Sequence, residues 1–319
     1  MRKQELMFAV LKQLAAAETD IVGKGVAKVV QLSKLPQRTL AINAHVLHRT
    51  IARRVAAIIV KIDRRPRLAL LLRPLRTTAV GRWLARRLLG YYRFYETIAE
   101  AEAYASKYLD RSHTHPSTID RQLSVSRRLR VSDYPVLFYI RPLLTGDRVL
   151  FDLGGNVGNL FYCYRRYCDL PPGFRWRILD LPQTMEAGRQ LAFERGFANT
   201  LEFASTLQEA SGSDILLLSG AAHYFDQSLP EMLTTLADPP PHVFINRAPL
   251  IRGDTCVTVQ DAGYVMHGCK LFNVEALQAG MRKLGYRVVD QWEAPELSLH
   301  VPLYPECSAP AYSGFYFSR

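Results

Sequence analysis

The stretch VLFDLGGNVGNLFYCYRRYCDLPPGFRWRILD, residues 149–180, decides the fold. It opens on a short apolar run, 149–151, of the kind that a strand buried on both faces shows. An acid and a glycine loop follow, then a segment of helical length, 159–167, and a second apolar run, 174–179, that ends in an acid. Strand, glycine turn, helix, strand and acid form the order of a nucleotide-binding βαβ unit.

Each residue of the loop has a physical reason. Gly154 and Gly155 permit backbone angles that a Cβ forbids, and they let a ligand lie against the main chain. Gly158 lets the start of the helix pack close to the strand, where backbone amides favour an anionic group. Asp152 can order the loop by accepting its amides, or it can reach a ligand's ammonium group. Asp180, just past the second strand, can accept hydrogen bonds from two ribose hydroxyls.

The spacing of the glycines separates the common nucleotide cofactors. A dinucleotide fingerprint that ends at Gly158 needs a further glycine at position 153, where the sequence has Leu153. A phosphate-binding P-loop needs Gly-Lys-Ser/Thr, which the stretch lacks. The pattern therefore counts against NAD and against a P-loop nucleotide.

The rest of the chain continues the alternation of strands and helices. Apolar runs predict further strands at 201–203, 215–218, 242–245, 286–292 and 314–318. Periodic segments predict helices at 183–196, 229–237 and 273–284, and glycines close the first and the last of them. The sequence thus predicts an α/β protein with a Rossmann-like seven-stranded sheet over 146–319, closed by a hairpin-like C-terminal pair of strands.

Two regions precede that sheet. Residues 1–90 predict an all-helical region with apolar stripes, interrupted by Pro66 and Pro74. Residues 91–145 predict a helical cap or connector, with helices over 91–109, 119–129 and 134–144. Aromatic residues of the last helix, Tyr134 and Tyr139 among them, are candidates to cover a pocket, although core packing explains them as well.

Charge is unevenly distributed along the 319 residues, whose formal net charge is +12. Residues 1–90 hold 19 Lys and Arg against four Asp and Glu, so the whole surplus belongs to the helical region. A solvated arginine face or a dimerisation arm explains it, as does an acidic carrier protein or an anionic membrane surface. Because Phe8 and Trp83 are its only aromatic residues, the region does not favour nucleic acid.

Cysteine content and hydropathy indicate the cellular setting of the protein and the kinds of site and segment it is expected to lack. The chain has five cysteines with no C-x-x-C pair, so we expect a reduced cytoplasmic setting and no metal site. No apolar run approaches the roughly 18 residues of a membrane-spanning helix, and no signal-peptide pattern opens the sequence.

Five segments from the first strand onward carry a resemblance to known proteins: DLGGNVG (152–158), RILDLP (177–182), DILLLSGAAHYF (214–225), FINRAPL (244–250) and SGFYFSR (313–319). From about residue 91 onward the chain resembles class I S-adenosylmethionine-dependent methyltransferases, in particular a bacterial family found in polysaccharide and natural-product gene clusters. Two departures from the family are Asp180, where relatives often carry Glu, and Asn246, where an Asp before the arginine is usual.

The resemblance implies S-adenosylmethionine as cofactor and places the ends of the parallel strands around it. The loop would hold its methionine end, Asp180 its ribose, and Leu181 and Ser205 its adenine, while Ser219 and Gly220 would line the sulfonium side. The cofactor-binding residues implied are Asp152, Gly154, Gly155, Asn156, Gly158, Asp180, Leu181, Ser205, Ser219 and Gly220.

A methyl acceptor needs a wall and, where it carries a proton, a base. His223, Tyr224 and Ser219 are the candidate catalytic residues. His267 lies in a segment, 264–272, where a substrate lid is common. Arg247 can bind an acceptor carboxylate or form a structural salt bridge. With Tyr134 and Tyr139, Arg247 and His267 complete the candidate substrate-binding residues.

The sequence leaves three functions open. The first is a methyltransferase that acts on a small molecule, such as a natural-product or saccharide intermediate. The second is a cyclase in which the α-amine of S-adenosylmethionine displaces sulfur from its own γ-carbon, giving azetidine-2-carboxylate and methylthioadenosine. The third is a catalytically inactive binding or scaffold protein with a basic helical arm. The acceptor, the nucleophilic atom and the oligomeric state are not fixed by the sequence.

Overall fold

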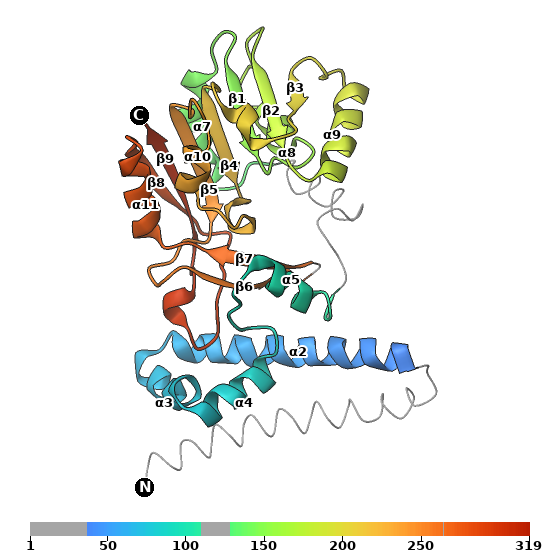
Figure 1. Ribbon diagram of the computed structural model, residues 1–319, viewed down its shortest axis with the longest axis vertical. Helices are drawn as coiled ribbons and strands as arrows, with labels where there is room; N and C mark the ends of the chain where they lie inside the picture. The colour runs from blue at the N-terminus through green and yellow to red at the C-terminus, as the bar shows by residue number, and fades with distance from the viewer. Residues whose placement is uncertain (1–36, 110–127, 264) are drawn as a thin grey trace. The chain divides into compact units, whose positions relative to one another are not determined.

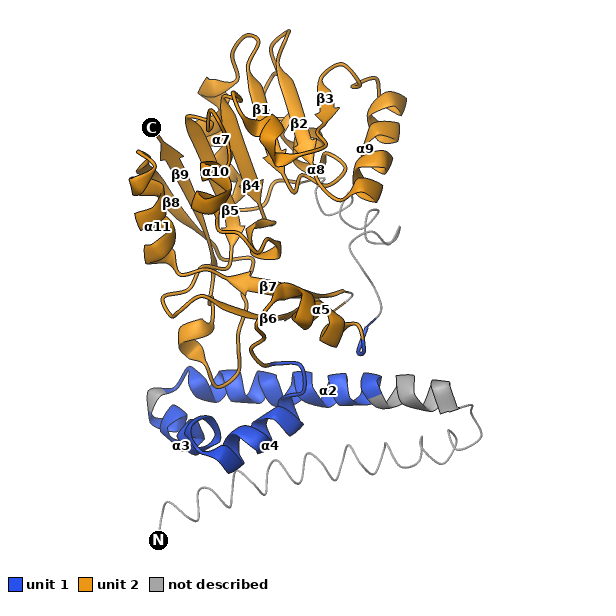
Figure 2. Ribbon diagram, viewed as in Figure 1, with its two compact units in different colours: residues 1–92, 107–109 blue, residues 93–106, 110–319 orange. Residues whose placement is uncertain are grey.

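A computed structural model describes residues 37–109, 128–263 and 265–319 (Figure 1). The chain divides into two compact units (Figure 2). Unit 1 comprises Met1–Tyr92 and Lys107–Leu109, and unit 2 comprises Arg93–Ser106 and Asp110–Arg319. Within the described ranges, no helix combines the length and the apolar character that crossing a bilayer requires.

Unit 1 is helical over its described residues, as the sequence predicts. Its helices are α2 Gln37–Asp63, α3 Pro66–Thr77 and α4 Ala79–Leu89. Pro66 opens α3, where a missing N–H costs nothing, whereas Pro74 lies inside α3 and does not end it. A Cβ on Gly81 would lie 2.2 Å from the Pro74 carbonyl oxygen, so α3 and α4 meet backbone to backbone. The predicted helical segments before residue 37 lie outside the described residues.

Unit 2 is built on a seven-stranded sheet with the order β3-β2-β1-β4-β5-β9-β8. The first five of these strands run parallel, and β9 and β8 pair antiparallel at one edge, which confirms the predicted sheet and its C-terminal pair. The strands are β1 Val149–Leu153, β2 Arg175–Leu179, β3 Leu201–Phe203, β4 Ile215–Ser219, β5 His242–Ala248, β8 Arg287–Ala294 and β9 Tyr312–Ser318.

Helices cover both faces of this sheet (Figure 1). One face packs against α7 Asp133–Ile140, α8 Asn159–Tyr164 and α9 Pro182–Glu194, and the other against α10 Leu229–Thr234 and α11 Val274–Lys283. Side chains alternate between the two cores, so Leu150 joins the first and Phe151 the second. Short 3-10 turns complete the unit: η1 Arg141–Leu143, η2 Leu207–Ala210, η3 Ala222–Tyr224 and η4 Pro305–Cys307.

A second, two-stranded sheet follows β5 and was not predicted. It consists of β6 Cys256–Asp261 and β7 Met266–Leu271, paired antiparallel. The segment expected as a substrate lid, 264–272, is therefore largely the second strand of a hairpin. Helix α5, Ile98–Ala105, packs on this hairpin so closely that a Cβ on Gly268 would lie 2.5 Å from the Ile98 carbonyl oxygen.

The helix predicted over 91–109 is wrong in its length, because only α5 is helical there. Tyr95 instead donates its backbone N–H to the Val257 carbonyl at 2.9 Å, which ties residues before α5 to β6. Thr97 then caps the helix by accepting the Glu100 N–H at 3.1 Å. The helix predicted over 134–144 is confirmed as α7 and η1. The one predicted over 119–129 lies almost entirely outside the described residues.

Candidate active site

The glycine loop leaves β1 at the C-terminal edge of the parallel strands. Gly154 has a φ of 76° and donates its N–H to the Leu179 carbonyl at 2.8 Å, so the loop begins as a continuation of the β1–β2 pairing. A Cβ on Gly154 would lie 2.3 Å from the Cβ of Ala221. A Cβ on Gly155 would lie 2.6 Å from the carboxylate of Asp152. These close approaches explain why positions 154 and 155 are both glycine.

Asp180 closes the loop from the end of β2. One of its carboxylate oxygens accepts the Asn156 N–H at 2.8 Å, and the other accepts the Leu181 N–H at 2.7 Å. Asn156 itself has a φ of 56°, and its side chain accepts the Val157 N–H at 2.9 Å. Burial raises the pKa of Asp180, and the two backbone hydrogen bonds oppose that rise. Each oxygen keeps a second lone pair, so the carboxylate can also accept from a ligand hydroxyl.

Asp152 lies within the sheet, one residue before β1 ends. It is buried, and its carboxylate accepts the indole N–H of Trp176 at 3.0 Å. Burial is the main cause that raises the pKa of Asp152 to about 7, and the nearby charge of Asp180 adds to it. The Trp176 hydrogen bond and the positive charge of Arg247 lower the pKa and only partly offset these causes. The structure therefore gives this carboxyl a supporting position behind the loop.

Ser219, the last residue of β4, and Asn246, two residues before the end of β5, lie side by side as register partners. Asn246 is fully buried, and its side-chain oxygen accepts the indole N–H of Trp292 at 3.0 Å, which fixes the amide. The Ser219 hydroxyl oxygen and the Asn246 side-chain nitrogen are buried and have no hydrogen-bond partner among the described residues. Gly220, with a φ of 76°, donates its N–H to the Asn246 carbonyl at 2.8 Å.

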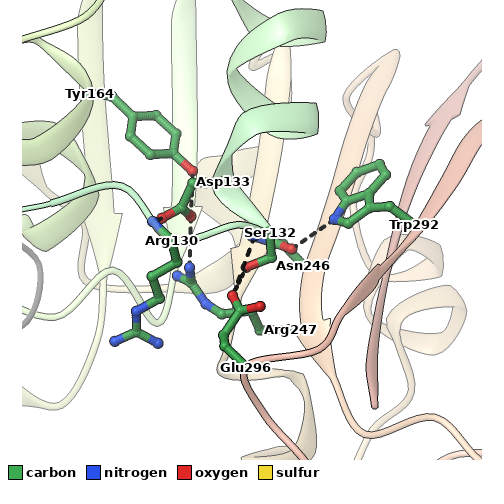
Figure 3. Close-up of polar contacts among 8 residues, drawn as sticks. All are labelled: Arg130, Ser132, Asp133, Tyr164, Asn246, Arg247, Trp292 and Glu296. Carbon is green, nitrogen blue, oxygen red and sulfur yellow. Dashed lines mark hydrogen bonds and ion pairs between the residues drawn. The ribbon is translucent and has the colours of Figure 1, made fainter.

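A buried ion pair ties the start of α7 to the end of β5 (Figure 3). Arg247 donates to a carboxylate oxygen of Asp133 at 2.6 Å, and both side chains are more than nine-tenths buried. The Tyr164 hydroxyl donates to the same oxygen at 2.9 Å, and the Arg130 N–H donates to the other at 2.9 Å. Arg247 is thus balanced within the protein, and the salt-bridge alternative describes it better than an acceptor-binding role.

Ser132, which directly precedes Asp133, forms a second contact that holds the start of α7 (Figure 3). The Ser132 hydroxyl donates to a Glu296 carboxylate oxygen at 2.5 Å, and the Ser132 backbone N–H donates to the same oxygen at 3.3 Å. Glu296 follows β8, so α7 is held at its start by segments that leave two different strands. This fixes α7 against the face of the sheet that carries Asp152, Ser219 and Asn246.

An aromatic and polar cluster stands beside the end of β4. The rings of His223 and Tyr224 are 4.0 Å apart, and the ring of His267, from β7, is 5.7 Å from Tyr224. The Tyr224 hydroxyl donates to the Gln260 side-chain oxygen at 2.7 Å, and the Gln260 amide donates to the Tyr312 hydroxyl at 2.7 Å. Burial raises the pKa of Tyr312. The predicted His223, Tyr224 and His267 are therefore brought together.

Other predicted residues lie apart from this cluster. Ser205 is exposed, and its backbone N–H is bound by the Glu209 carboxylate at 2.7 Å. Leu181 is about half exposed at the end of β2. Tyr134 is exposed on α7. Tyr139 points toward the β8 edge, where its hydroxyl donates to Asp290 at 3.0 Å, and that hydrogen bond raises its pKa.

Several site residues were missed by sequence reasoning. Each makes its contact across a long stretch of chain: Asp133 with Arg247, Trp292 with Asn246, and Gln260 with Tyr224. The sequence carried one signal for the last of these, since apolar and polar residues alternate from Val257 to Gln260 within β6. The other two contacts, Asp133 with Arg247 and Trp292 with Asn246, leave no pattern in the sequence, because only the folded chain brings these residues together.

The residues present fit a nucleoside cofactor with an amino-acid tail. The glycine loop offers bare main chain that a Cβ would fill, and Asp180 offers an acceptor for hydroxyls. Ser219 and Asn246 offer buried polar atoms that have no partner in the part of the chain that the structure describes. Among the described ranges, no group of three His, Cys, Asp or Glu side chains is arranged to hold a metal ion.

The chain was compared with known proteins at three levels. No protein-family model matches it, and no curated protein matches it. Solved structures do match, including the mitomycin 7-O-methyltransferase, at 16% identity and a TM-score of 0.37 over 84% of this chain and 67% of that one.

A Burkholderia thailandensis 1,6-didemethyltoxoflavin N1-methyltransferase, solved with S-adenosylhomocysteine, matches at 16% identity and a TM-score of 0.40, over 63% of this chain and 82% of that one. The magnesium protoporphyrin IX methyltransferase of Synechocystis PCC 6803, also solved with S-adenosylhomocysteine, matches at 14% identity and a TM-score of 0.41, over 63% of this chain and 87% of that one.

Proposed function

We propose that this protein is an S-adenosylmethionine-dependent methyltransferase that acts on a small molecule. One observation carries the proposal. The carboxylate of Asp180 stands at the end of β2 and binds the glycine loop that follows β1, as a ribose-binding acid of such a site would. The strand order, with β9 antiparallel between β5 and β8, supports it.

S-adenosylmethionine supplies a methyl carbon that a positively charged sulfur already activates. The chain's part is to hold the reacting atoms in line, to exclude water and to receive a proton from a protonated acceptor. Asp180 accepts the ribose hydroxyls, and the loop from Gly154 to Gly158 lets the amino-acid tail approach the main chain. Ser219 and Asn246 present buried polar groups on the sulfonium side.

The acceptor would lie against the cluster of His223, Tyr224 and His267. Tyr224 donates its hydroxyl proton to Gln260, so its orientation is fixed and it shapes the wall. Burial keeps Tyr312 protonated by raising its pKa. The imidazole of His223 is then the group that takes the acceptor's proton, and His267 is a second imidazole next to Tyr224 that borders the acceptor.

The test is the affinity for S-adenosylhomocysteine, measured by titration calorimetry on the full chain. Asp180→Ala should weaken it at least about tenfold, because one hydrogen bond to a charged group contributes about 1.5–3 kcal/mol. Glu186→Gln is the matched control, since Glu186 is exposed on α9 and pairs only with Arg189 at 3.2 Å within the described residues.

Two results would contradict the proposal. One is an affinity for S-adenosylhomocysteine that stays within twofold in Asp180→Ala, and the other is no binding by the unmodified protein. If binding is as expected, a panel of small hydroxyl, phenol and amine acceptors, scored by release of S-adenosylhomocysteine, identifies the acceptor class. His223→Ala should then lose turnover while the affinity for S-adenosylhomocysteine stays unchanged.

A further inference from the structure

Helices α3 and α4 of unit 1 expose large apolar side chains. Leu70 is 66% exposed on α3, and Val80 and Trp83 are 76% and 60% exposed on α4. Trp83 is the exposed member of the chain's three tryptophans, since Trp176 is buried and Trp292 is half-buried. These side chains lie on helices whose other faces already pack within unit 1, where Gly81 and Leu89 are buried.

Arginines surround these apolar side chains. On α4, Val80, Trp83 and Arg87 are three and four residues apart and so share one face, and the Arg87 guanidinium lies 5.8 Å from the Trp83 ring centre. On α3, Arg67 and Arg73 flank Leu70 at the same spacing. Residues 45–92 hold twelve Arg and Lys but a single acid, Asp63.

We propose that α3 and α4 form a docking surface for an anionic membrane, defined by Arg67, Leu70, Arg73, Val80, Trp83 and Arg87. Arginines bind the anionic headgroups, while the tryptophan and the aliphatic side chains enter the boundary between headgroups and acyl chains. Long arginine side chains suit this boundary because their stems are apolar and their ends are charged. Such a helix lies in the plane of the membrane surface and needs no spanning segment.

Charge and apolar exposure together favour this partner over the others. Single-stranded nucleic acid binds by stacking on aromatic rings, and this surface offers one ring, with aliphatic side chains that phosphates do not contact. Two copies of the surface would bring like charges together, which opposes a symmetric dimer through it. A membrane with anionic lipids accepts both the arginines and the apolar side chains.

The test is flotation of the full chain with lipid vesicles. Vesicles of phosphatidylcholine with about 30% phosphatidylglycerol should carry the protein, pure phosphatidylcholine should carry at least about tenfold less, and added salt should release it. Trp83 should report the contact by a blue shift of tryptophan emission and by protection from iodide.

Matched variants separate this surface from general charge and stickiness. Arg73→Glu with Arg87→Glu should lower vesicle binding at least about tenfold, whereas Arg282→Glu with Lys283→Glu, exposed on α11 of unit 2, should change it less than about twofold. Trp83→Ser should abolish the blue shift and weaken binding, and Phe193→Ser, at a residue 75% exposed on α9, should do neither. Circular dichroism of each variant confirms that it is folded.

Several outcomes would overturn the proposal. Equal binding to neutral and anionic vesicles would do so, as would no binding at low salt or equal losses in the two charge-reversal variants. A further contrary result is an unmodified protein that does not bind vesicles, together with an Arg73 and Arg87 variant that no longer dimerises or no longer binds nucleic acid or an acidic carrier protein. The surface would then be the binding site for that other partner.

Discussion

Asp152→Asn should remove a pH dependence of stability that the structure assigns to one buried carboxyl. Asp152 is 1% exposed, and burial raises its pKa from 3.8 to about 7. The unfolded chain releases this proton near its ordinary pKa, so between the two values the folded state binds more protons. The free energy of unfolding must therefore fall as pH rises through this window.

The magnitude follows from the two pKa values. A change from 3.8 to about 7 corresponds to at most about 4 kcal/mol, because one pKa unit is about 1.4 kcal/mol. Between about pH 5 and pH 7.5, proton linkage lowers this carboxyl's contribution to the free energy of unfolding by about 2.5 kcal/mol. Asp152→Asn keeps a neutral group and an oxygen that accepts the Trp176 N–H, so its unfolding free energy does not include this decrease with rising pH.

The assay is urea unfolding of both proteins, followed by tryptophan fluorescence at a series of pH values. The difference in unfolding free energy, unmodified protein minus Asp152→Asn, should fall by about 2.5 kcal/mol from about pH 5 to pH 7.5. Asp254→Asn, at an exposed carboxyl in the loop before β6, should run parallel to the unmodified protein. A difference for Asp152→Asn that stays constant within about 0.5 kcal/mol would refute the reasoning.

Two further predictions concern stability and the glycine loop. Asp133→Ala should lower the unfolding free energy by about 3–5 kcal/mol because it leaves the buried Arg247 unpaired, whereas Arg189→Ala, at an exposed pair, should cost below about 1 kcal/mol. Equal costs in urea unfolding would contradict this. Gly154→Ala should weaken S-adenosylhomocysteine binding at least about tenfold, because its Cβ would lie 2.3 Å from that of Ala221. Ala221→Gly should restore part of the affinity, and calorimetry that shows normal binding by Gly154→Ala alone would be the opposing result.

The sheet could be predicted because its signals are local. Each parallel strand is a short apolar run bounded by turn residues, and the loop at Gly154 and Gly155 identifies the strand that precedes it. The position of Asp180 relative to that loop follows from the same βαβ unit, and its hydrogen bond to the Asn156 N–H agrees with it. Local order thus places one half of the candidate site.

The other half depends on contacts between distant residues. Whether residues 91–97 continue α5 is decided by the pairing of Tyr95 with Val257, and no helical periodicity near Tyr95 reports that pairing. The β6–β7 hairpin brings Gln260 and His267 to Tyr224 although it stands outside the main sheet. For Tyr139 the helix was predicted correctly, but the direction of the side chain, toward Asp290 of β8, was not.

The polypeptide passes between the two units at residues 92–93, 106–107 and 109–110. Residues 107–109 return to unit 1, where the Tyr108 ring packs 5.1 Å from that of Tyr91 and its hydroxyl lies 3.4 Å from a His48 nitrogen. A gene trimmed to begin at residue 93 would therefore strip Tyr108 of these neighbours. A single proteolytic cut at any one of these passages would divide the chain into two fragments, at least one of which carries residues of both units. Because α5 packs on β6 and β7 of unit 2 while residues 107–109 belong to unit 1, a single crossover point between related genes could not exchange unit 1 without dividing one of these two sets of contacts.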